Sequence, residues 1–276
     1  MRASRRVAFI VASAAALGVG LFAFTGSAAA EPVVPSCTPV ASTGNKSCVT
    51  LKITPSNAPT GFGPVALAAR TRTTYAVPGN KPQGGFAKTV TLLFDNDITV
   101  NPAAVSGNCQ VADVANKTIP QAYAACGPAG KNAYLAPANT ISGRASTAPP
   151  SNFGACTLLF KGPTTNQIVL YARVTTVANS NPTCTTPAGS SAGNVAVTLT
   201  GTIAAAGVAG YGKKLTVPNI DGLTLPLDDF YATVNRGSYA QARCPAGTSP
   251  WKLRGIFVYS GSGQATDTVN ATQACS

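Results

Sequence analysis

Short runs in which apolar and polar residues alternate recur along most of this chain and constrain its fold more than any other feature. In the run 251–259, Trp251, Leu253 and Phe257 alternate with Lys252 and Arg254. Successive side chains of a β-strand point to opposite faces of the sheet, so a period of two indicates a half-buried strand. A chain built from such runs folds as a sheet protein with one apolar face on each strand.

The same pattern predicts strands over most of the chain, and turns rich in Gly, Pro, Asn and Ser separate them. The predicted strands are residues 49–53, 65–77, 88–94, 98–100, 157–160, 167–177, 195–203, 214–217, 230–234, 251–259 and 265–271. Gly and Ser between the last two runs favour a hairpin. The chain is therefore predicted to be all-β, an antiparallel β-sandwich of immunoglobulin-like or jelly-roll-like type, with one short helix and several disulfides.

The short helix is predicted over residues 119–126. Thr118 and Gln121 have the spacing of a capping box, and Pro120 lies in the first turn, where a missing N–H does no harm. Gly127 and Pro128 are expected to end the helix.

The first thirty residues have the three parts of a secretory signal: Arg2, Arg5 and Arg6, an apolar run over 7–24, and small residues over 26–30. We expect cleavage after Ala30. The alternative is an uncleaved anchor, because the apolar run is just long enough for a marginal span. With no lipid-acceptor cysteine, second span or sorting tail, we expect a secreted, extracellular protein, free or associated with the cell wall, with no membrane span after signal removal.

The mature chain divides into two parts. Residues 31–47 are rich in Pro, Ser and Thr without apolar periodicity, which predicts a flexible N-terminal arm. Residues 48–276 are predicted to form a disulfide-stapled β-sandwich domain. One continuous domain is preferred, and two packed lobes divided near 179–193 are the alternative.

Eight cysteines form an even set, which in an exported protein indicates disulfides. A zinc site is disfavoured because the sequence has no histidine and no closely spaced cysteine pair. Many pairings are possible, and proximity in sequence suggests one of them. It joins Cys37 to Cys48, Cys109 to Cys126, Cys156 to Cys184, and Cys244 to Cys275.

The protein has a net charge of +12, with 20 basic and 8 acidic residues. Such a charge suits an anionic polymer of the cell envelope, or another extracellular protein, as partner. Arg70 and Arg72 on one strand, with Lys252 and Arg254 on another, would form a cationic surface if those strands are neighbours. The alternative is an ordinary solvated face. Nucleic acid is not expected, because no basic stripe with interleaved aromatics is present.

No catalytic, cofactor-binding or metal-binding residue is predicted. The absence of histidine removes Ser-His-Asp and Cys-His catalysis. Asp228 and Asp229 are adjacent, so on a strand they would point to opposite faces and would not form a carboxylate pair. The cluster Asp95-Asn96-Asp97 offers too few ligands for calcium and is more typical of a turn.

Four short runs resemble those of an uncharacterised family of exported, cysteine-containing, β-rich proteins from actinobacterial genomes. They are SGNC (106–109), TIPQAYAACG (118–127), FGAC (153–156) and WKLRGIFVY (251–259). The family has no assigned activity or ligand, so the resemblance implies export, a cysteine framework and a β-rich fold.

These observations favour a secreted, non-enzymatic protein with a structural, adhesive or binding role at or outside the cell envelope. Two alternatives remain. One is a secreted hydrolase or inhibitor of unfamiliar type that works without histidine. The other is an extracellular carrier of a small ligand bound between the sheets, which would require the facing layers to leave a cavity.

Overall fold

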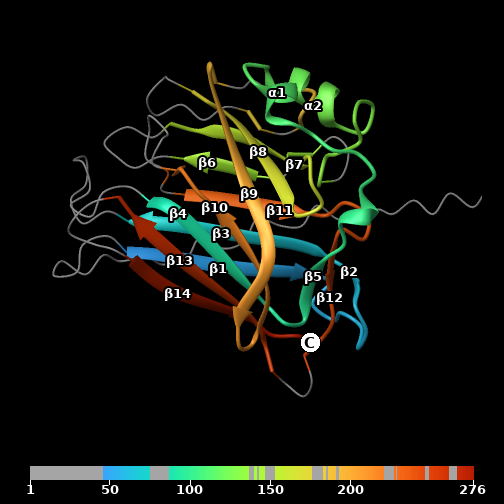
Figure 1. Cartoon of the computed structure of the whole chain (residues 1–276), viewed down its shortest axis with the longest axis vertical. Coiled ribbons are helices and arrows are strands. Elements are labelled where there is room, and N and C mark those ends of the chain that lie inside the picture. The colour runs from blue at the N-terminus through green and yellow to red at the C-terminus, as the bar shows by residue number, and fades with distance from the viewer. Residues whose placement is uncertain are drawn as a thin grey trace, which may run out of the picture.

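The computed structural model describes most of the residues that follow the predicted arm. The described residues are 46–74, 87–136, 140–141, 143–146, 153–175, 183–184, 186–190, 193–220, 227, 229–245, 249–260 and 266–276. They form an antiparallel all-β fold with short helices, as the alternating runs predict (Figure 1). The predicted export signal and nearly all of the predicted arm lie outside the described residues.

One sheet of eleven strands makes up most of the described structure. In spatial order these are β1 (Lys46–Thr54), β3 (Ala66–Thr74), β11 (Asp229–Val234), β6 (Gly143–Ser146), β7 (Ala155–Lys161), β8 (Gln167–Val174), β9 (Val195–Val208), β10 (Tyr211–Val217), β4 (Ala87–Asp95), β13 (Trp251–Tyr259) and β14 (Thr266–Gln273). Strands β13 and β14 form the predicted hairpin. The segment 179–193, considered as a lobe boundary, connects two neighbouring strands of this sheet, β8 and β9.

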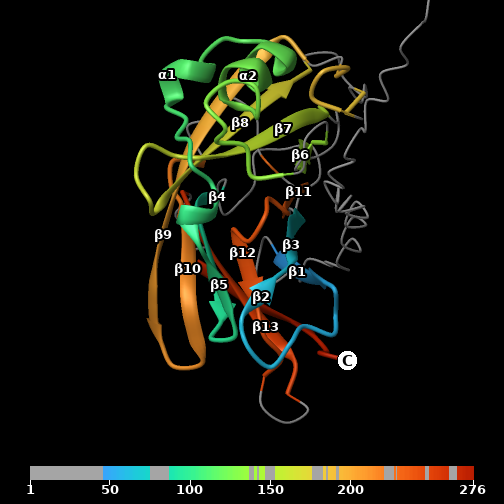
Figure 2. The ribbon, with the colours of Figure 1, turned by 90° about the vertical axis from the view of Figure 1, so that its right-hand side faces the viewer.

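The sheet bends back on itself, so its two halves face each other. Figure 2 shows β9 and β10 on one side of the molecule and β1 and β3 on the other. Buried and more exposed side chains alternate along β1 and β13. Strand β1 buries every second residue, and β13 buries Trp251, Leu253 and Phe257. The inward faces of the two halves therefore enclose a common apolar interior.

The two edge strands, β1 and β14, meet through side chains. The Ser47 amide donates to the Asp267 carboxylate at 2.7 Å, and the Ile53 amide donates to the Gln273 side chain at 2.6 Å. Gln273 also donates to the Ile53 carbonyl at 2.9 Å. Both pairs are separated by 220 residues, so the two strands run parallel along this seam. Side chains thus satisfy backbone groups that an exposed edge would leave unpaired.

A second, smaller sheet lies beside the first and comprises β2 (Gly63–Pro64), β12 (Ala240–Ala242) and β5 (Ile98–Val100). A 3-10 turn, Pro102–Ala104, follows β5. Of these three strands only β5 was predicted from the sequence; β2 and β12, and the four-residue strand β6 of the large sheet, were not.

Helix α2 (Ile119–Cys126) has the predicted capping box, in which the Gln121 amide donates to Thr118 and the Thr118 amide donates to Gln121. A four-residue helix, α1 (Val111–Val114), precedes it and was not predicted. The helical segment that contains α1 and α2 packs on the outer face of β7 and β8, where Leu158, Phe160 and Tyr171 are fully buried.

Three disulfides join the cysteines that are close in sequence. They are Cys109–Cys126, Cys156–Cys184 and Cys244–Cys275, the pairings that proximity predicts. Cys48 is also disulfide-bonded, and its predicted partner, Cys37, lies outside the described residues. The first of these bonds ties both ends of the helical segment together, and the last ties the C-terminal residues to the region after β12.

Candidate functional site

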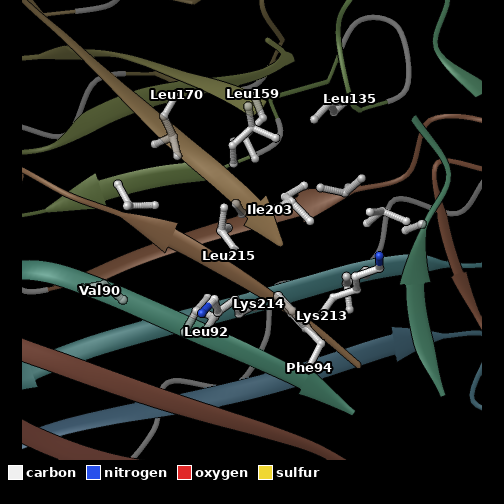
Figure 3. A pocket seen from close by; sticks show the side chains of 18 of the residues that line it. Val90, Leu92, Phe94, Leu135, Leu159, Leu170, Ile203, Lys213, Lys214 and Leu215 are labelled. Carbon is white, nitrogen blue, oxygen red and sulfur yellow. The ribbon is translucent and has the colours of Figure 1, made fainter. Parts of the chain in front are cut away.

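A cavity of about 130 Å³ lies between the two halves of the large sheet. Its wall comes from the inward faces of β3 and β11 on one side and of β4, β9 and β10 on the other, with β5, β7 and β8 between them (Figure 3). An engineered apolar cavity of about 150 Å³ holds benzene. The cavity is therefore large enough for a small organic molecule.

Most of the lining is aliphatic. Val90, Leu92 and Phe94, which are alternate residues of the predicted strand 88–94, all line this cavity. They are joined by the leucines at 135, 159, 170, 199 and 215 and by Ile168 and Ile203. Such a wall gives an apolar ligand dispersion contacts and removes its surface from water.

Tyr239 brings the most unusual polar group to this wall. Its side chain is 1% exposed, and its hydroxyl has no hydrogen-bond partner. Burial raises the pKa of Tyr239 to about 12, so the phenol keeps its proton at ordinary pH. An unpartnered buried hydroxyl costs free energy that a ligand oxygen accepting its proton would recover.

Two lysines of β10 belong to the wall as well, and the sheet register orients them differently. Lys213 lies opposite Phe94, whose side chain lines the cavity. Lys214 lies opposite Leu93, which packs on the outer face with Tyr211 and Ile256. Figure 3 shows the two lysine side chains leaving β10 in different directions.

Lys213 is half-buried on the inward face. Among the ion pairs of the described residues, none involves Lys213. The polar groups that this wall offers are therefore a phenol, an ammonium and the hydroxyls of Thr71 and Thr99.

The described aspartates lie away from the cavity. Asp229, Asp97 and Asp113 pair with Arg70, Arg243 and Lys131, respectively. Asp267 accepts from the Ser47 amide at the seam, and Asp95 accepts from the Asp97 amide. Asp221 and Asp228 lie outside the described residues, so the Asp228–Asp229 pair cannot be placed in full.

The turn between β4 and β5 holds Asp95-Asn96-Asp97. The Asp97 amide donates to the Asp95 side chain at 3.0 Å, which is the local bonding typical of turns. Burial raises the pKa of Asp95. The Asp97 carboxylate accepts from Arg243 at 2.5 Å. The two carboxylates thus have protein partners, in keeping with the turn interpretation.

One group of the described residues has ligand atoms near enough for a metal ion: Cys109, Asp113 and Cys126. The two cysteines form a disulfide, and their sulfurs are therefore not available as thiolates. The Asp113 carboxylate accepts from Lys131, which holds the pKa of Asp113 below its usual value against the opposing effect of its desolvation. The Cys109–Cys126 disulfide and the Asp113–Lys131 ion pair thus account for this cluster.

The four basic residues considered for an anionic polymer lie on strands that are not neighbours. Arg70 and Arg72 lie on β3 and Lys252 and Arg254 on β13, and β1 and β14 lie between these strands across the seam. Arg70 is 4% exposed and makes a two-pronged ion pair with Asp229. The condition that the two strands be neighbours is therefore not met, and one guanidinium is already neutralised.

Lys252 and Arg254 remain on the outer face of β13. Lys252 is exposed, whereas Arg254 is half-buried, donates to Asn270 at 3.1 Å and lies 4.8 Å from the Tyr211 ring centroid. These contacts are those of an ordinary solvated strand face, in which the stem of a long side group packs over apolar neighbours.

Sequence reasoning missed Tyr239 and Lys213. Tyr239 lies in a turn directly before β12, where no periodic pattern marks its direction. Lys213 directly precedes the predicted strand 214–217, but β10 begins earlier, at Tyr211. Only the register of the neighbouring strands indicates that Lys213 faces inward.

Comparison with known proteins adds no family: no family model, curated protein or solved structure matches the sequence. Among the described residues, no helix is both long enough and apolar enough to cross a membrane.

Proposed function

We propose that this protein is a secreted binding protein that holds a small, mostly apolar molecule between the two halves of its sheet. The observation that carries the proposal is the apolar cavity, whose lining includes Tyr239 with its buried, unpartnered hydroxyl. Ligand pockets are typically apolar with a few placed polar groups, which is the composition of this wall.

The size of the cavity limits the ligand. At about 130 Å³ the space is comparable to one that holds benzene, so a molecule of about six carbons sets the scale. The export signal expected at the N-terminus and the three described disulfides support action outside the cytoplasm.

The test uses the purified mature protein with its disulfides intact and 1-hexanol as the probe. Binding to the folded state alone raises the free energy of unfolding, by about 2.7 kcal/mol at a hundred times Kd. For a protein of this size that corresponds to a rise of about 5–10 °C in Tm. We expect such a rise, measured by thermal unfolding.

Two variants show where the probe binds. Ala232→Leu adds carbon to the cavity wall and is expected to reduce the rise in Tm. Thr268→Leu makes a comparable change on the exposed face of β14 and is expected to leave the rise unchanged. Absence of any rise in the unmodified protein, or an equal rise in Ala232→Leu, would count against binding in the cavity.

A further inference from the structure

The inward face of β10 holds a cation where the rest of the wall is almost entirely apolar. Lys213 shares this face with Leu215, because Lys213 lies opposite Phe94 and Leu215 lies opposite Leu92. All four residues line the cavity. A half-buried ammonium in such surroundings loses part of its hydration, and an opposite charge offsets that loss.

A bulge in β10 turns Lys213 inward. The register with β4 shifts between Tyr211 and Lys213, so Gly212 is an extra residue on β10 relative to β4. In the register with β9, the shift at the same place leaves the extra residue on β9. Tyr211, two residues before Lys213, packs on the outer face with Leu93 and Ile256. Without the bulge, residues 211 and 213 would face the same way. The bulge thus turns the Lys213 side chain toward the cavity.

Within the described residues no carboxylate lines the cavity, and none forms an ion pair with Lys213. The nearest acidic residues along the adjoining strands, Asp95 and Asp97, are engaged in their own turn and with Arg243. Among the described residues, therefore, no side chain neutralises Lys213 in the cavity, and an anionic bound molecule would supply the opposite charge.

We propose that the ligand is a small amphipathic carboxylate, whose anionic head binds the Lys213 ammonium and whose hydrocarbon body lies among the cavity leucines. A charge-assisted hydrogen bond of this kind is about twice as strong as a neutral one. The Tyr239 hydroxyl, which remains protonated, donates to an oxygen of the ligand. This inference rests on the proposed function, because it names the ligand class of the same cavity.

The experiment compares hexanoate with 1-hexanol at pH 7 by isothermal titration of the full mature protein. The two probes have the same carbon number and differ in the charge of the head. We expect hexanoate to bind at least about tenfold more tightly, a ratio that corresponds to about 1.4 kcal/mol.

Lys213→Met keeps the length of the side chain and removes its charge. We expect this variant to lose the preference for hexanoate while it still binds 1-hexanol. Lys252→Met is the matched control, since Lys252 is exposed on the outer face of β13 and does not line the cavity. It removes the same charge from outside the cavity and is expected to keep the preference.

The outcomes separate the two proposals. If 1-hexanol binds but hexanoate binds no better, or if Lys252→Met lowers the preference as much as Lys213→Met does, the carboxylate assignment is overturned and the apolar binding site stands. If neither probe binds the unmodified protein, the binding site and the carboxylate assignment both fail. The first comparison needs no variant, so it remains decisive even if a lysine substitution impairs folding.

Discussion

The two ends of the interior are packed differently. Where β1 faces β13, large side chains fill the space: Trp251, Leu253 and Phe257 are at most 2% exposed. Where β3 and β11 face β4, β9 and β10, the inward side chains are mostly aliphatic and a cavity remains. The same sheet supplies both ends, so side-chain size rather than strand arrangement decides which end is filled.

The polar groups of the two ends differ in the same way. At the filled end, the Trp251 indole donates to the Arg243 carbonyl at 2.8 Å, and the Tyr259 hydroxyl is hydrogen-bonded to Ser47. At the cavity end, the Tyr239 hydroxyl has no partner. Most buried polar groups are satisfied in folded proteins. Of the two buried hydroxyls without a partner among the described residues, those of Thr157 and Tyr239, the one of Tyr239 belongs to a residue that lines the cavity.

The largest expected difference between the two ends comes from shortening a leucine at each. Leu253→Ala removes a fully buried side chain from the filled end and is expected to lower the free energy of unfolding by about 3–5 kcal/mol. Leu215→Ala enlarges a space that already exists and is expected to cost about 1–2 kcal/mol, because Leu215 is half-buried. Denaturant unfolding measures both, with circular dichroism as a check on folding. Equal losses would contradict the comparison.

High pH is expected to lower the free energy of unfolding through one buried tyrosine at each end of the interior. Burial raises the pKa of Tyr239 and of Tyr259 to about 12, from 10 for an exposed phenol. The unfolded state therefore releases these protons first, and the stability that is fully present below pH 10 falls as the pH rises toward 12. By pH 11 the loss is about 1 kcal/mol for each tyrosine.

Unfolding midpoints at pH 8, 10 and 11 measure this loss. The double variant Tyr239→Phe with Tyr259→Phe is the control, and it is expected to show a shallower decline over this range. A decline as steep as that of the unmodified protein would mean that other groups govern alkaline stability.

The smallest effects are expected from removing one hydroxyl at a time at neutral pH. Tyr259→Phe leaves the buried Ser47 hydroxyl without one of its partners and is expected to cost about 1–2 kcal/mol. Tyr239→Phe removes a hydroxyl that has no partner, so we expect no loss, or a slight gain, in the absence of ligand.

Thermal unfolding with and without 1-hexanol distinguishes the two tyrosines further. Tyr239→Phe is expected to reduce the stabilisation by the probe, whereas Tyr259→Phe is expected to keep it. A clear destabilisation by Tyr239→Phe alone would indicate that its hydroxyl has a structural role.

The sequence determined the local structure of the described residues to a large extent. The apolar runs place β1, β4, β7, β8 and β13 within a few residues of their bounds. Strands β1 and β13 alternate because they bury one face, whereas nearly all residues of β7 and β8 are buried. The capping box fixes the start of α2 at Thr118, and cysteines close in sequence pair with each other. These features depend on neighbours in sequence, which the pattern of residues displays directly.

Only the tertiary structure determined where the cavity lies and which residues line it. The cavity wall takes residues from Leu67 to Ala240, and whether they leave a space depends on how far the sheet bends. The strand order also separates the two pairs of basic residues, since β3 and β13 are not neighbours. The bulge at Gly212 turns Lys213 inward and Tyr211 outward, although strict alternation would give them one face. Alternation predicts two faces for every strand, but register and curvature, set by contacts between distant segments, decide what each face meets.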